Sequence, residues 1–90
     1  MAALDAELKQ IANELEGRLA NDNGVPRNIR KGASNAVELL LDNSKAMDLR
    51  IQSAINILAD LLEVNNIPSE AWSVIMSIMA DLEGVLKEIS

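Results

Sequence analysis

The sequence contains no cysteine and no histidine, and Trp72 is its single aromatic residue. Disulfides, zinc sites built from cysteine and histidine, and catalysis by a thiolate or an imidazole are therefore excluded. With no phenylalanine or tyrosine, the chain lacks an aromatic surface on which exposed bases stack. The longest stretch without a charged residue, residues 71–80, has half the roughly 20 apolar residues of a membrane-spanning helix. We therefore expect no enzyme activity, no cofactor, no metal site and no membrane span.

The residues that are present are those of one small acidic domain. The chain has 90 residues, 49% of them hydrophobic, which is enough to build a core. Eight lysines and arginines against 14 acidic residues give a net charge of −6. That charge disfavours generic binding to nucleic acid or to anionic lipid. Because Asp5 and Glu7 stand near the start, where a secretory signal would have a basic region, we expect a cytoplasmic protein.

Apolar residues recur at helical spacing along the chain, and no run alternates as a β-strand does. The spacing predicts four helices, over about residues 3–21, 26–42, 45–63 and 68–89. Gly24 is predicted to end the first helix in a left-handed conformation. Pro26 and Pro68 are predicted to open the second and fourth helices, and Ser44 to cap the third.

Short links between these helices make consecutive helices antiparallel, so the sequence predicts an all-α domain over residues 1–90. The expected architecture is a four-helix antiparallel up-and-down bundle. A shift of 42 residues places Asn23-Gly24-Val25-Pro26 on Asn65-Asn66-Ile67-Pro68, which suggests two duplicated helical hairpins. A period near 40 also suits an open solenoid of paired helices. We favour the closed bundle, because stacked open hairpins would leave more apolar surface in water.

The last predicted helix is apolar around more than one face. One interpretation is that its additional apolar residues only widen the stripe that faces the core. The other is that Val74, Ile78 and Val85 meet a second copy of the chain or another protein. The second interpretation predicts a homodimer formed through this helix.

Three cations stand in the first turns of the second predicted helix, where they oppose the helix dipole: Arg27, Arg30 and Lys31. One interpretation is pairing within the chain, with carboxylates such as Glu14, Asp22 or Glu70. The other is a site for an anion or a partner, made by Arg27, Asn28, Arg30 and Lys31 with the backbone N–H groups that follow Pro26.

Three glycines lie inside predicted helices, at Gly17, Gly32 and Gly84. Glycine destabilises a helix interior by about 1 kcal/mol relative to alanine. We therefore predict that another helix approaches closely at these positions, above all at Gly32, which stands beside Ala33 and Ala36.

The segment Val25-Pro26-Arg27-Asn28-Ile29-Arg30, followed by Ala33 and Ala36 and then by Ala54-Ile55-Asn56-Ile57-Leu58, resembles a family of short uncharacterised archaeal proteins. The similarity extends from about Leu8 to Glu83. It implies a four-helix bundle with a bromodomain-like arrangement of helices and no assigned activity. The matching positions of the more specific segment are Pro26, Arg27, Asn28 and Arg30. A chain without tyrosine or phenylalanine cannot build an aromatic acetyl-lysine pocket, so the bromodomain likeness is one of geometry alone.

The function expected from the sequence is a non-catalytic helical interaction or scaffold module with an unidentified protein partner. It would self-associate through its last helix and use Arg27, Arg30 and Lys31 as a polar docking point. The alternative is an accessory protein of a ribonucleoprotein or nucleic-acid complex that places the same three cations on phosphate. A metal-dependent enzyme built from carboxylates alone is the least favoured hypothesis.

Overall fold

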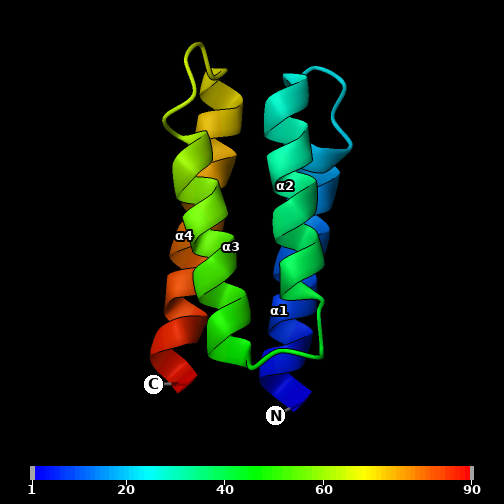
Figure 1. Ribbon diagram of the computed structural model, residues 1–90, viewed down its shortest axis with the longest axis vertical. Helices are drawn as coiled ribbons and strands as arrows, with labels where there is room; N and C mark the ends of the chain where they lie inside the picture. The colour runs from blue at the N-terminus through cyan, green and yellow to red at the C-terminus, as the bar shows by residue number, and fades with distance from the viewer. Residues whose placement is uncertain (1, 90) are drawn as a thin grey trace.

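The predicted apolar stripes form four α-helices in the computed structural model, which describes residues 2–89 (Figure 1). The helices are α1 (Ala2–Leu15), α2 (Arg27–Leu40), α3 (Met47–Leu61) and α4 (Ser69–Ile89). A five-residue π-helical segment, η1 (Glu16–Ala20), continues α1. The described part of the chain contains no β-strand. The all-α fold predicted from the sequence is confirmed.

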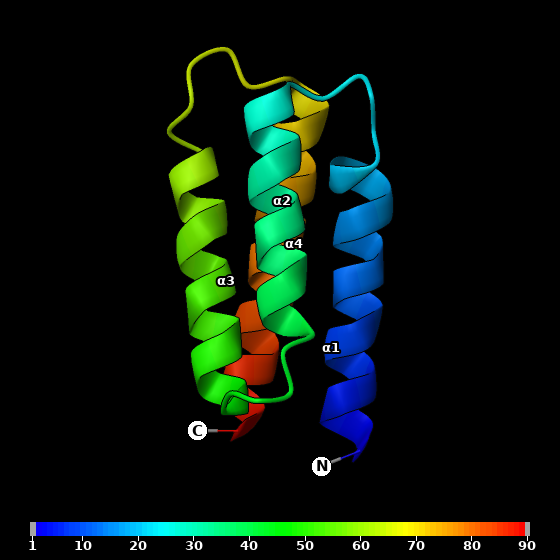
Figure 2. The same ribbon diagram turned by 45° about the vertical axis from the view of Figure 1, so that its right-hand side comes forward.

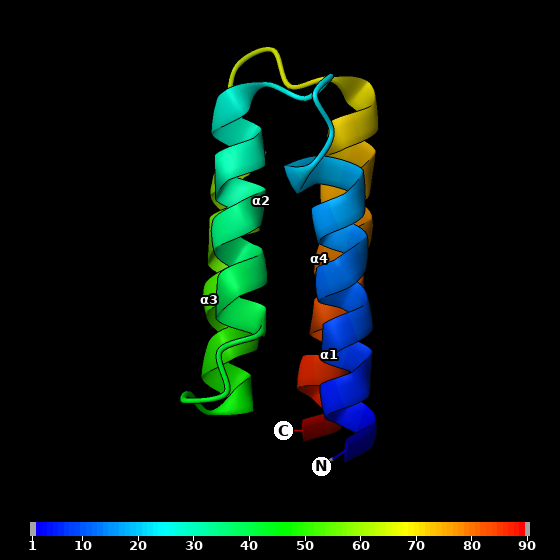
Figure 3. The same ribbon diagram turned by 90° about the vertical axis from the view of Figure 1, so that its right-hand side faces the viewer.

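The helices run alternately up and down, so both ends of the described chain lie at the same end of the bundle (Figure 1). Seen from the side, α2 and α3 form one half of the bundle and α1 and α4 the other (Figure 3). Each helix contacts its neighbours in the chain, and α1 also contacts α4, whereas the diagonal pairs are not in contact within residues 2–89. The helices therefore close into a bundle rather than an open solenoid, with dimensions of 37 × 20 × 18 Å.

One hydrophobic core runs along the bundle and receives side chains from every helix. Its fully buried members include Leu8, Leu15, Ile29, Leu40, Ile51, Leu58, Ile75 and Leu82. The helices α2 and α3 approach closely at Gly32, where an added Cβ would lie 2.6 Å from a methyl carbon of Leu61. The prediction for Gly32 is confirmed. It is wrong for Gly17 and Gly84, where a Cβ would meet nothing within 4 Å in the described chain.

Two helix ends differ from the sequence prediction. Gly24 does not have a positive φ. The first helix instead ends in a π turn, in which the N–H of Asn21 donates to the carbonyl of Glu16 at 2.9 Å. Ala46, not Ser44, precedes the first residue of α3. The Ser44 hydroxyl is engaged within the loop, where it donates to Oδ1 of Asp42 at 2.5 Å. The helices α2 and α4 begin directly after Pro26 and Pro68, one residue later than predicted.

The loops 21–26 and 41–46 share one hydrogen-bonding pattern, 20 residues apart. In each loop an aspartate, Asp22 or Asp42, accepts through Oδ1 from the N–H two residues later, at 2.9 and 3.0 Å. The N–H groups of both aspartates donate to the carbonyl three residues earlier. The third connection differs, because Asn66 takes a φ of 63°. The similarity of loops 21–26 and 41–46 is thus not the one predicted at 42 residues, and the duplication of hairpins stays a prediction.

Candidate functional site

The three cations predicted as a site lie on the first turns of α2, at one end of the bundle. They are Arg27, Arg30 and Lys31, which we call the basic corner. Spacings of three and four residues place them on one face of the helix. Arg27 and Lys31 are exposed, and Arg30 is partly buried.

No carboxylate of residues 2–89 lies within 4 Å of a cationic nitrogen of the basic corner. Elsewhere in the chain, Arg18 pairs with Glu14 at 3.5 Å and Arg50 reaches Asp5 at 4.0 Å. The interpretation that the three cations pair with Glu14, Asp22 or Glu70 is therefore wrong for this fold. Their charge faces solvent without an internal counter-ion.

Hydrogen bonding leaves the polar groups around the basic corner only partly satisfied. Arg30 donates from a terminal guanidinium nitrogen to Oδ1 of Asn23 at 3.4 Å, while its buried Nε has no acceptor. Oδ1 of Asn28 accepts from the N–H of Ile29 at 3.0 Å, so the amide nitrogen of Asn28 is left to donate. The residue before α2 is Pro26, and no side chain caps the first turn. The structure thus gathers donors at the four predicted site positions.

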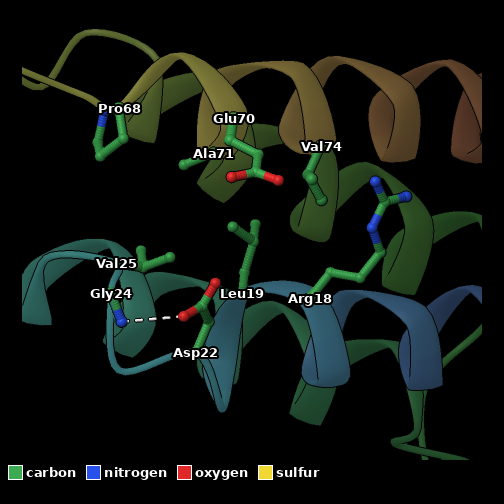
Figure 4. A pocket seen from close by; sticks show the side chains of 9 residues that line it. All are labelled: Arg18, Leu19, Asp22, Gly24, Val25, Pro68, Glu70, Ala71 and Val74. Atoms are coloured by element: carbon green, nitrogen blue, oxygen red, sulfur yellow. Dashed lines mark hydrogen bonds between the residues drawn. The ribbon is translucent and has the colours of Figure 1, made fainter.

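A pocket of about 390 Å³ lies next to the loop that leads into the basic corner (Figure 4). Leu19, Val25 and Val74 contribute apolar side chains, whereas Arg18, Asp22 and Glu70 contribute charges. Figure 4 shows Oδ1 of Asp22 held by the N–H of Gly24, so this carboxylate is already used inside the loop. The pocket combines a small apolar surface with charges of both signs, and the sequence analysis did not predict it.

The residues predicted to self-associate are buried inside the chain. Val74 is 4% exposed, and Ile78 and Val85 are each 1% exposed. α4 packs against both α1 and α3, so it needs a wide apolar arc to meet two neighbours. The prediction that Val74, Ile78 and Val85 meet a second copy is therefore wrong, and these side chains widen the core stripe.

Arg50 is a buried polar residue that the sequence analysis missed. Although it is only 6% exposed, its Nε and one terminal nitrogen donate to the carbonyl of Leu40, at 3.2 and 2.5 Å. It therefore joins the start of α3 to the last residue of α2. The available signal was its place in the apolar stripe, three residues after Met47 and four before Ala54.

Asp42 is the one described acidic group with a shifted pKa. The hydrogen bonds from the Ser44 hydroxyl and then from the Ser44 N–H hold its pKa below the ordinary value of 3.8, and the charges of Lys45 and Arg50 add to this. The shift has a structural cause within the loop. It is not the signature of a proton-transfer site, because no second titrating group shares the proton.

Two further classes of site were searched for in residues 2–89. No group of three or more carboxylates lies close enough together to hold a metal ion. None of the described helices is long and apolar enough to cross a membrane.

The sequence matches the model of a family described as the uncharacterised protein family UPF0147 over residues 1–85. A UPF0147 protein of Thermococcus kodakarensis is 37% identical over 78 residues, which cover 87% of this chain and 94% of that protein. One from Methanopyrus kandleri is 31% identical over 85 residues, which cover 94% of this chain and 82% of that protein.

Two solved structures have the same fold. The crystal structure of a protein of unknown function matches with a TM-score of 0.81 and 36% identity, over 86% of each chain. A crystal structure from the UPF0147 family of Thermoplasma acidophilum matches with a TM-score of 0.83 and 25% identity. That match covers 92% of this chain and 98% of the other.

Proposed function

Because this chain belongs to UPF0147, a family of uncharacterised and mostly archaeal proteins, we propose its role from its own surface: a non-catalytic helical module that binds an acidic protein segment. The observation that carries the proposal is the basic corner. Arg27, Arg30 and Lys31 have no carboxylate partner within residues 2–89, although the chain as a whole has a net charge of −6. The cytoplasmic location expected from the sequence stays a prediction.

The chemistry of the basic corner suits carboxylates. Arginine offers a planar fork of N–H donors that matches a carboxylate group, and charge-assisted hydrogen bonds are about twice as strong as neutral ones. The N–H groups at the start of α2 carry the positive end of the helix dipole and add to the attraction. The buried Nε of Arg30, which has no acceptor in the described chain, limits how this guanidinium is placed. An acidic segment that covers the corner would neutralise three cations at once.

A nucleic-acid complex is the second candidate, because phosphate would also suit these three cations. Two features of the chain disfavour it. The net charge of −6 repels a polyanion over the rest of the surface, and the one aromatic residue, Trp72, lies on α4 rather than beside the corner.

Capture from native extract with three baits tests both candidates. The baits are the wild type, Arg27→Glu/Lys31→Glu, and the control Lys9→Glu/Lys45→Glu, which makes the same charge change at exposed lysines elsewhere. We expect a protein that the wild type and the control retain and the corner variant loses, whether or not nuclease is added. Loss of the partner on nuclease treatment, with binding that weakens steeply in salt, would support the nucleic-acid candidate instead. Equal retention by all three baits would contradict any role for the corner.

A further inference from the structure

The solvent-facing side of α4 carries a second regular pattern, which faces away from its buried stripe. Exposed residues recur there at alternating steps of three and four, and we call them the α4 seam: Glu70, Ser73, Ser77, Ala80, Gly84 and Lys87. Such steps are those of the contact positions in a two-stranded coiled coil. α1 and α3 pack against the other side of α4, so this seam is left without a partner helix in the described chain.

We propose that the α4 seam binds the α4 seam of a second copy of this chain, with the two helices antiparallel about a two-fold axis. In such an interface each residue faces its counterpart on the other side of the axis. With the axis between residues 78 and 79, Glu70 faces the partner's Lys87, Ser73 faces the partner's Gly84, and Ser77 faces the partner's Ala80. Both ends of the seam then pair opposite charges, and its middle pairs small residues. A parallel pair would instead place like charges on each other.

Gly84 is an independent observation in favour of this interface. A Cβ at this position would meet nothing within 4 Å, and the residue does not have a positive φ. Packing and backbone conformation within the chain therefore give no reason for a glycine, which weakens a helix interior. In the proposed pair Gly84 lies opposite the partner's Ser73, where a missing side chain allows the two helix axes to approach closely.

Two large apolar side chains lie exposed on the same helix, one turn apart at one edge of the seam. Trp72 is 47% exposed and Met76 is 42% exposed. A second copy would cover part of both. Because residues 71–80 carry no charge, the middle of the interface forms without burying an ionised group.

The proposal is independent of the basic corner, because α4 lies diagonally across the bundle from α2 (Figure 2). A single helix pair buries less than the roughly 800 Å² per partner of a standard stable complex. We therefore expect a weak dimer whose population rises with protein concentration.

Sedimentation from about 10 μM to about 1 mM protein, the range of weak dissociation constants, tests the association itself. We expect the wild type to dimerise, and Ala80→Arg to weaken dimerisation at least about tenfold because it buries like charges near the axis. Ala3→Arg makes the same change at an exposed position of α1 and should dimerise like the wild type. A wild type that stays monomeric over the whole range, or an Ala80→Arg variant that dimerises equally well, would overturn the proposal.

Charge exchange tests the register. Glu70→Lys and Lys87→Glu should each weaken self-association, because both ends of the seam then meet like charges. Mixing the two variants should restore a dimer, since every end pair is again of opposite sign. Circular dichroism of each variant checks that it remains helical. If the folded variants do not associate with each other when mixed, the proposed register is wrong.

Cross-linking tests the direction of the helices. The chain has no cysteine, so an introduced thiol reacts only with another introduced thiol. Ser73→Cys chains should form a disulfide with Gly84→Cys chains and not with each other. In the antiparallel register two Ser73 positions are about 16 Å apart along the axis, beyond the reach of a disulfide. Efficient cross-linking between two Ser73→Cys chains would contradict the proposed interface.

Discussion

Residues 22–30 and residues 42–50 build the same unit twice, an aspartate-led loop followed by the first turn of a helix. The two segments are Asp22-Asn23-Gly24-Val25-Pro26-Arg27-Asn28-Ile29-Arg30 and Asp42-Asn43-Ser44-Lys45-Ala46-Met47-Asp48-Leu49-Arg50. Their hydrogen bonds correspond as well. Oδ1 of Asn28 and of Asp48 each accepts from the next N–H, at 3.0 and 2.9 Å. Each unit ends in an arginine, but the two arginines have different surroundings.

Arg50 is buried and donates twice to the carbonyl of Leu40, whereas Arg30 is partly exposed and donates once, to Asn23. The helices before the two loops end differently. α2 keeps its α-helical bonding up to Leu41, while η1 ends α1 with a π turn. Arg50 thus meets the end of α2 and reaches Asp5 of α1, and Arg30 has no such contact with a carboxylate. The comparison teaches that one local motif can supply a structural arginine in one copy and a surface cation in the other.

The largest expected effect comes from removing the buried guanidinium. Arg50→Met keeps most of the side-chain length and deletes both hydrogen bonds to Leu40. We expect it to lower the free energy of unfolding by about 2–3 kcal/mol, because hydrogen bonds from a charged donor contribute about 1.5–3 kcal/mol. Urea denaturation measures the change.

The matched change in the first unit is Arg30→Met. It should lower the free energy of unfolding by less than about 1 kcal/mol, as is usual for a surface position. Equal losses for Arg30→Met and Arg50→Met would show that the two arginines do the same work, and would remove the contrast between the units.

An intermediate effect is expected at the residue before each helix. Ala46 has φ −61° and ψ 145°, close to the φ −53° and ψ 146° of Pro26. The N–H of Ala46 donates no hydrogen bond within residues 2–89. Ala46→Pro should therefore stabilise the protein by about 0.4–1 kcal/mol, because it restricts the unfolded chain without loss in the folded one. The reverse change, Pro26→Ala, should destabilise it by a similar amount. A destabilising Ala46→Pro, measured by thermal unfolding, would show that the two loops are not equivalent.

The smallest effect concerns the one loop position where serine replaces glycine. Ser44→Gly removes the hydroxyl that donates to Asp42, so the pKa of Asp42 should rise toward its ordinary value. NMR titration of the Asp42 carboxyl measures this shift. Ser44→Ala is the control for backbone effects and should raise the pKa similarly. An unchanged pKa in both variants would mean that the hydroxyl is not its main cause.

The lowered pKa of Asp42 also fixes the direction of its pH dependence. Its contribution to stability is present above the unfolded pKa of about 3.8 and is lost as the pH falls through the lower folded value. Ser44→Gly should therefore lose less stability than the wild type on acidification below about pH 4.

Helix positions and the four-helix fold followed from local patterns in the sequence. Apolar spacing predicted the helices to within a few residues, and Pro26 and Pro68 marked two of their starts to within one. The predicted end at Gly24 and cap at Ser44 were wrong, because an aspartate side chain organises each of these loops. Propensity at one residue could not reveal a hydrogen bond set by its neighbour two positions earlier.

The site could be predicted only in part. Charge and position along α2 were sufficient to select Arg27, Asn28, Arg30 and Lys31, since i, i+3 and i+4 spacing is a local property of a helix. Whether these cations pair with a carboxylate depends on which helices lie beside them, and the sequence left both interpretations open. The same holds for Val74, Ile78 and Val85, whose burial depends on α4 meeting two helices rather than one.

By itself the sequence determined that this chain forms helices, where they begin, and which side of each is apolar, because these follow from the spacing of residues within a few turns. Only the tertiary structure decided which charges are neutralised, that Arg50 is buried, and that the outer side of α4 is left uncovered. Those outcomes depend on contacts between residues distant in the chain, and the strength of a charge or an apolar group depends on what those contacts exclude from water.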